Sequence, residues 1–130
     1  MRMMLVGAGA VGECILKVLK KRDGKGEWLP YVLITDYDGK RAEEVRTHVT
    51  ADGECRISFA CAQADAHDKG RLISLMREHE IDFVMDAASP FVSNYIFDAA
   101  YEAGADYASM GTWSVPKDHP AFGVGFEGSY

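Results

Sequence analysis

The chain has 130 residues, 48% hydrophobic and 26% charged, which suits one globular domain with a core of its own. Acidic residues outnumber basic ones by 20 to 14, and the net charge of −6 argues against nucleic acid or an anionic membrane as the main partner. The apolar runs are too short to span a bilayer, so no membrane association is expected.

The N-terminal segment is predicted to form a strand over residues 3–6, a glycine-rich turn, and a helix over residues 9–21. The turn has the pattern G-x-G-x-x-G, and its strand–turn–helix context gives the pattern its meaning. Its three glycines would permit a tight turn, close approach of a pyrophosphate, and close packing of the helix on the sheet, respectively. Phosphates would bind the free N–H groups at the helix start. The predicted phosphate loop comprises Gly7, Ala8, Gly9, Ala10, Val11 and Gly12.

The same helix carries apolar residues at helical spacing, which are predicted to face the sheet. These residues are Val11, Ile15, Val18 and Leu19.

The second predicted strand, residues 31–35, is a continuous apolar run, as expected for a strand covered on both faces. Asp36 stands at its end, 24 residues beyond Gly12, where a dinucleotide site places an acid to hold the ribose hydroxyls. Its charge would repel a 2′-phosphate, which favours NAD over NADP. Lys40 and Arg41 follow closely and leave NADP open as the alternative.

A helix over residues 40–49 and a strand over residues 56–61, placed near the sheet edge by its alternating pattern, come next. The polar loop 63–68 precedes a helix over residues 69–79 and would border an adenine pocket, which makes Asp65 and Ala66 candidate contacts. Alternatively, Asp65 or Asp68 caps the helix, and one residue could do both. His67 is interpreted as a solvated loop residue.

The fourth strand is predicted over residues 82–88, followed by a helix over residues 91–103 and a fifth strand over residues 105–109. Small residues between strand and helix would leave room for a nicotinamide ribose. The candidate contacts there are Ala87, Ala88, Ser89 and Pro90. The alternative is a tight loop without a role in binding.

Four strand–helix repeats closed by a fifth strand predict an α/β fold: a Rossmann-type doubly wound parallel sheet of strand order 3-2-1-4-5, with helices on both faces. Residues 1–110 are assigned to this dinucleotide-binding domain. Residues 111–130 are rich in Gly, Pro and aromatic residues, and are interpreted as a linker or the start of a missing second, substrate-binding domain. Alternatively, their aromatic side chains fold back on the sheet or pair in a homodimer.

Three cysteines, Cys14, Cys55 and Cys61, show no metal-type spacing and are predicted to be buried free thiols, with no metal site. Free thiols suit a reducing compartment, and the N-terminus lacks the features of a signal peptide, so a cytoplasmic location is expected. The four histidines are scattered along the chain, and no residue is assigned a catalytic role.

Taken together, these motifs resemble the NAD(P)-binding domain of the saccharopine dehydrogenase-like family over nearly all of the first 110 residues. The glycine motif alone is shared by unrelated folds, so the later segments carry more weight. The segments that carry the resemblance are residues 4–12, 35–36 and 64–66, the small-x-Pro-Phe loop 88–91 and the helix-to-strand junction 102–107.

The resemblance implies an NAD(P)-dependent oxidoreductase acting on C–N bonds of amino acids, opine-like conjugates or polyamine precursors. In such a protein the substrate-binding and catalytic residues lie mostly in a second domain, so these 130 residues alone would be inactive. One alternative is a regulatory nucleotide-sensing module, like the domains that gate potassium transport. Another is a lyase or synthase that keeps NAD bound through a redox cycle.

Overall fold

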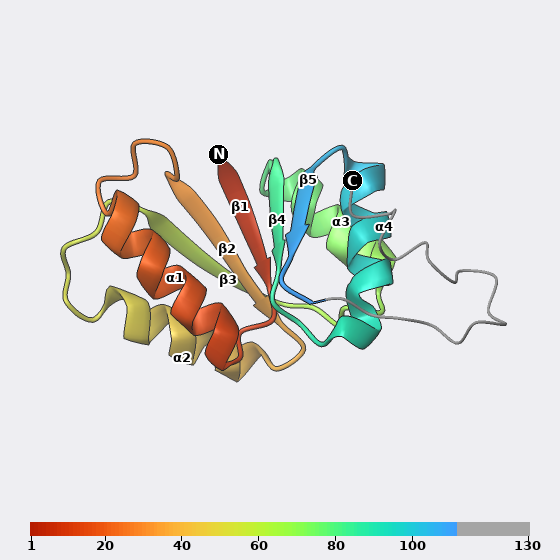
Figure 1. Ribbon diagram of the computed structural model, residues 1–130, viewed down its shortest axis with the longest axis horizontal. Coiled ribbons are helices and arrows are strands. Elements are labelled where there is room, and N and C mark those ends of the chain that lie inside the picture. The colour runs from red at the N-terminus through yellow and green to blue at the C-terminus, as the bar shows by residue number, and fades with distance from the viewer. Residues whose placement is uncertain (112–130) are drawn as a thin grey trace, which may run out of the picture.

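The structure is a computed structural model that describes residues 1–111 (Figure 1). Its centre is a five-stranded parallel sheet in the order β3-β2-β1-β4-β5, which confirms the predicted topology. The strands are β1 (Arg2–Val6), β2 (Tyr31–Asp36), β3 (Ser58–Gln63), β4 (Phe83–Asp86) and β5 (Asp106–Ser109).

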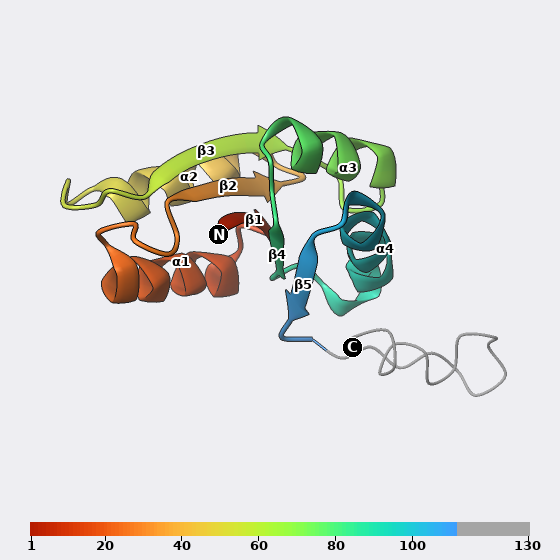
Figure 2. The same ribbon diagram turned by 90° about the horizontal axis from the view of Figure 1, so that it is seen from above.

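The helices form a layer on each face of this sheet (Figure 2). They are α1 (Ala10–Asp23), α2 (Gly39–Thr50), α3 (Lys69–Glu78) and α4 (Ser93–Ala103), and a short 3₁₀ turn, η1 (Pro90–Val92), leads into α4. One core cluster packs the sheet against α1 and α2, and a second packs it against α3 and α4. The fold is therefore Rossmann-type, as predicted.

The middles of β1, β2 and β4 are apolar because helices cover both faces of the sheet, whereas Arg2, Asp36 and Asp86 stand at strand ends. Met4, Leu33 and Val84 face α3 and α4, whereas Leu5 and Ile34 face α1 and α2. All five side chains are fully buried.

The predicted bounds of the edge strand were wrong by two residues. The sequence pattern placed it over residues 56–61, whereas β3 spans Ser58–Gln63. The Arg56 N–H group donates to Gly24 O at 2.8 Å, and Ile57 is buried in the core beneath α1 and α2. The parallel ladder therefore starts only at Ser58, which pairs with Tyr31.

The predicted buried face of α1 was wrong for Val11 and Val18, whereas Leu19 packs against the core as predicted. Val11 and Val18 are 56% and 47% exposed, and the buried residues are instead Gly12, Leu16 and Asp23. Gly12 must face the turn after β1, where only a hydrogen atom fits, and this contact sets the rotation of the helix. The buried positions then follow at helical spacing from Gly12.

All three cysteines are free, but Cys14 is exposed and Cys55 and Cys61 are only half-buried, so the expectation of buried thiols was wrong for Cys14. No helix within residues 1–111 is long and apolar enough to cross a membrane. Apart from Gly111, the segment interpreted as a linker or second-domain start lies outside the described residues.

Candidate functional site

The turn after β1 is built around Gly7, whose φ of +100° strongly favours glycine. Its N–H group donates to Thr35 O at 2.9 Å, which ties the turn to β2. A Cβ atom on Gly7 would lie 2.8 Å from the backbone of Ala87 and Ala88. Gly7 therefore brings the turn after β1 against the loop after β4, at the edge where both strands end.

Gly9 lies beside open space at the start of α1. A Cβ atom there would have no other atom within 4 Å, and no side chain caps the helix at this position. The N–H groups of a first helical turn have no partner within the helix and carry the positive end of its dipole. This combination suits an anion such as a phosphate group.

Side chains from β2 and α2 hold both polar groups of the Ala8 peptide. The Ala8 N–H group donates to Asp36 Oδ2 at 2.8 Å, and Arg41 Nε donates to Ala8 O at 2.7 Å. Asp36 Oδ1 also accepts from the Asp38 N–H group at 2.9 Å. Each carboxylate oxygen keeps acceptor capacity for a ligand hydroxyl. Arg41 is engaged with the loop and with Glu44, at 3.4 Å.

A cavity of about 420 Å³ opens at the carboxyl ends of β1, β2 and β4. It is lined by Val6, Gly7, Asp36, Tyr37, Ala64, Asp65, Ala66, His67, Ala88, Ser89 and Val92.

Six of the residues predicted from sequence line this cavity: Gly7, Asp36, Asp65, Ala66, Ala88 and Ser89. The others do not: Ala8, Gly9, Ala10, Val11, Gly12, Ala87 and Pro90. Ala8 to Gly12 belong instead to the turn and first helical turn beside it, Ala87 belongs to the loop after β4, and Pro90 begins η1.

Asp65 and His67 form the rim contributed by the loop after β3. Asp65 Oδ1 accepts from the backbone N–H of His67 and contacts its Nδ1, both at 2.9 Å, and these bonds lower the pKa of Asp65. Asp68, and not Asp65, caps α3, by accepting from the Arg71 N–H group at 3.0 Å. Asp65 therefore does not cap the helix, and it lines the cavity.

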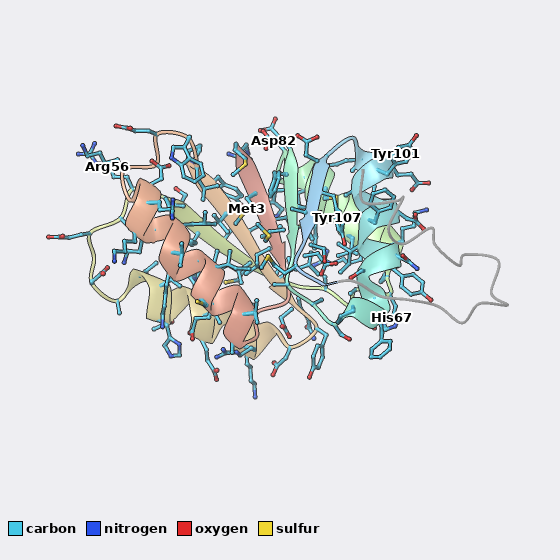
Figure 3. The ribbon with its side chains drawn as sticks, viewed as in Figure 1. Met3, Arg56, His67, Asp82, Tyr101 and Tyr107 are labelled. Carbon is cyan, nitrogen blue, oxygen red and sulfur yellow. The ribbon has the colours of Figure 1, made fainter. Side chains whose placement is uncertain are left out.

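His67 was interpreted as a solvated loop residue, and its side chain is 61% exposed, with its ring centroid 5.1 Å from that of Tyr95 on α4; its place in the cavity lining was not predicted. Figure 3 places His67 at the end of the molecule opposite to Arg56 and Asp82. Tyr37, 76% exposed beside Asp36, was also missed. Its place directly after the acid was the available signal, but an exposed aromatic residue in a turn is not by itself indicative of a site.

Asp86, at the end of β4, is a second feature that sequence reasoning missed. Its carboxylate is 1% exposed and accepts from the Ala88 N–H group at 3.0 Å and the Tyr107 hydroxyl at 2.7 Å. Burial raises the pKa of Tyr107, as do this hydrogen bond and the charge of Asp86. The chain turns at Asp86, so β4 ends two residues earlier than predicted. A carboxylate ending an otherwise apolar strand was the signal in the sequence.

Residues 1–111 contain neither a cluster of metal ligands nor an activated Cys61 thiol. No three His, Cys, Asp or Glu side chains in this part of the chain come together to hold a metal ion. Burial raises the pKa of the Cys61 thiol to about 11, which keeps it protonated and unreactive. No residue of this segment is therefore assigned a catalytic role.

Comparison with known proteins gives a family match. A family model described as the saccharopine dehydrogenase NADP binding domain matches residues 3–119. A carboxyaminopropylagmatine dehydrogenase from Synechocystis sp. is 24% identical over 115 residues, which are 88% of this chain and 27% of that protein.

Solved structures share the fold. Saccharopine dehydrogenase (L-Glu forming) from Saccharomyces cerevisiae superimposes with a TM-score of 0.63 at 12% identity, over 89% of this chain and 22% of that one. A UDP-glucose-4-epimerase from Stenotrophomonas maltophila, with bound NAD, gives a TM-score of 0.60 at 22% identity, over 92% of this chain and 40% of that one. The chain spans only about a quarter of the length of the dehydrogenases it resembles.

Proposed function

The chain belongs to the family of saccharopine dehydrogenase NADP-binding domains, and from this premise we propose that it holds the dinucleotide cofactor of a larger oxidoreductase. The observation that carries the proposal is the cavity at the strand ends, which adjoins the uncapped start of α1. The pyrophosphate would lie in the open space beside Gly9, on the N–H groups of the first helical turn.

The two nucleosides would extend to either side of this turn. The adenosine ribose would bind Asp36, with the adenine beside Asp65 and Ala66. The nicotinamide half would pass the loop after β4, of which Ala88 and Ser89 line the cavity. The nicotinamide carries the hydride, and the role of this chain is to bind and orient it.

We propose NAD as the preferred cofactor. A 2′-phosphate on the adenosine ribose would lie beside the Asp36 carboxylate, and the two negative charges would repel each other. Arg41, one of the two basic residues that could bind that phosphate, is engaged with the Ala8 carbonyl and with Glu44. The family is named for NADP, so cofactor preference is the first property to measure.

The substrate class is also part of the proposal, and family membership supports it. The complete protein would oxidise or reduce a C–N bond in an amino acid, an opine-like conjugate or a polyamine precursor. The substrate-binding groups would come from a second domain, starting after about residue 110. The family match lends no support to the alternative of a nucleotide-sensing module of the potassium-transport type.

Calorimetric titration of the 130-residue chain with NAD and with NADP tests the proposal. We expect both to bind at one site, with NAD tighter. Absence of binding by either cofactor would overturn the assignment of the site. The same protein, supplied with cofactor and a panel of amino acids, should show no turnover, and measurable turnover would contradict the two-domain interpretation.

A further inference from the structure

The Asp86 carboxylate is a buried acceptor without a cationic partner among the described residues. Both groups that contact it, the Ala88 N–H and the Tyr107 hydroxyl, are donors. No Lys, Arg or His side chain of residues 1–111 lies within ion-pair distance of it. Burying an unpaired charge costs free energy, so this arrangement calls for an explanation beyond a loop anchor.

The position of this carboxylate relates it to the proposed cofactor cleft. Asp86 pairs with Val6 on β1 and with Ser109 on β5. Val6 and Ala88 both line the cavity, so the charge lies directly behind its wall on the β4 side. Asp36 lies on the other side of the glycine turn, at the end of β2.

These two carboxylates therefore face different halves of a dinucleotide. In a doubly wound sheet the ligand crosses the point where the strand order reverses, here between β1 and β4. With the adenosine held at the β2 side by Asp36, the nicotinamide extends over the ends of β4 and β5, which is the side of Asp86.

We propose that Asp86 makes the site favour the oxidised cofactor over the reduced one, an inference that rests on the proposed dinucleotide binding. The oxidised nicotinamide ring carries a positive charge and the reduced ring carries none. A fixed negative charge close to the ring thus attracts only the oxidised form. The two forms are otherwise nearly identical in shape and in their contacts with the phosphate loop.

The expected size of the effect follows from the Coulomb energy. For an assumed separation of about 10 Å between the Asp86 carboxylate and the ring, and an effective dielectric constant of about 20, two unit charges attract each other enough to change an equilibrium constant by roughly tenfold. Screening by salt reduces this figure, so we expect Asp86 to shift the ratio of the two dissociation constants by about three- to tenfold.

The competing explanation is purely structural: Asp86 would hold the loop after β4 and contribute nothing else. In that case its replacement would weaken the binding of both forms by the same factor. The ratio of the NAD⁺ and NADH dissociation constants therefore separates the two explanations, whereas either affinity alone does not.

The test uses Asp86→Asn in the 130-residue chain. The amide oxygen can accept from the Ala88 N–H group and the amide nitrogen can donate to the Tyr107 oxygen, so the variant removes the charge and keeps two hydrogen bonds. Calorimetric titration should show that NAD⁺ affinity falls about three- to tenfold relative to NADH. Asp86→Ser, a second neutral variant with an acceptor, should shift the ratio the same way if the amide variant folds poorly.

Tyr107→Phe is the matched control, because it removes one hydrogen bond of Asp86 and keeps the charge. Its ratio should stay within about twofold of the wild-type value. An unchanged ratio in Asp86→Asn, or an equal shift in Tyr107→Phe, would overturn the inference while leaving dinucleotide binding intact. Wild-type protein that binds neither form would instead overturn the proposed function itself.

Discussion

The carbonyl oxygen of Gly7 occupies the space into which a side chain on Gly12 would project. The oxygen cannot easily move aside, because the Gly7 N–H group is bonded to Thr35 O and the Gly7 Cα faces the backbone of Ala87. This contact joins the turn after β1 to the first turn of α1. It thereby sets both the position and the rotation of the helix whose N-terminus faces the proposed pyrophosphate.

Gly12→Ala should therefore destabilise the protein. The added Cβ atom must displace backbone, and overpacking of this kind costs about 2–3 kcal/mol in the free energy of unfolding. Urea denaturation followed by circular dichroism measures the loss. Gly70→Ala in α3 is the control, because its Cβ atom would lie at ordinary van der Waals distance, 3.7 Å, from Asp68 Oδ1. Equal stability of the two variants would contradict the role of the Gly7–Gly12 contact.

Gly9→Val should abolish dinucleotide binding and preserve the fold. The valine side chain enters space that is empty of protein atoms and that the pyrophosphate is proposed to fill. The change in unfolding free energy should be about 1 kcal/mol or less, because this position is a helix N-cap with extended backbone. Calorimetry and thermal melting report the two properties separately. Normal cofactor affinity in this variant would show that the phosphates bind elsewhere.

Asp36→Asn should reduce the preference for NAD over NADP. The variant keeps a side-chain acceptor near the Ala8 N–H group but removes the charge that would repel a 2′-phosphate. We expect the ratio of NADP to NAD dissociation constants to fall about tenfold, by titration with both cofactors. Asp38→Asn, at the N-cap of α2, removes the same charge from a neighbouring position and should leave the ratio of the NADP and NAD dissociation constants unaltered. A ratio that does not respond to Asp36→Asn would remove the argument for NAD.

Acid pH should destabilise the protein in part through Asp23. Burial alone would raise the pKa of this carboxyl, but hydrogen bonds from the N–H groups of Leu29, Trp28 and Glu27 outweigh burial and lower it. Its folded pKa is thus below its unfolded value near 3.8, so its contribution is present at neutral pH and is lost as pH falls below about 4.

Thermal melting of Asp23→Asn and wild type between pH 7 and pH 3 tests whether the stability that Asp23 contributes is lost as the pH falls. The variant should be less stable at pH 7, and the difference between the two proteins should narrow towards pH 3. A difference that stays constant over this range would show that the charge of Asp23 does not contribute.

The fold could be predicted from sequence because its signals are local. Continuous apolar runs mark the central strands, and the glycine pattern marks the crossing from strand to helix. The sequence predictions were wrong where contacts between residues far apart in the chain determine the structure. The rotation of α1 depends on the Gly7 carbonyl, and the start of β3 depends on a bond between Arg56 and Gly24. Neither contact leaves a periodic trace in the sequence.

Part of the lining of the candidate cavity could also be predicted from the sequence. Asp36 was found because its distance from the glycines is characteristic, and it lines the cavity. Asp86 was missed because a strand residue is judged by its neighbours in sequence, whereas its partners are Ala88 and Tyr107. The place of His67 in the cavity lining was not predicted, because a polar loop indicates only a solvated side chain.

The hydrogen bonds of Asp36 and Arg41 to the backbone of Ala8 have a consequence for changing the cofactor preference of this protein. Asp36 accepts from the Ala8 N–H group in addition to its proposed role at the ribose, and Arg41 donates to the Ala8 carbonyl oxygen. A change of cofactor preference that deletes the acid, or that recruits the arginine to a new phosphate, would also loosen the turn that is proposed to bind the pyrophosphate. Engineering of this protein towards NADP should therefore add a cation at another position, and leave the acceptor for Ala8 in place.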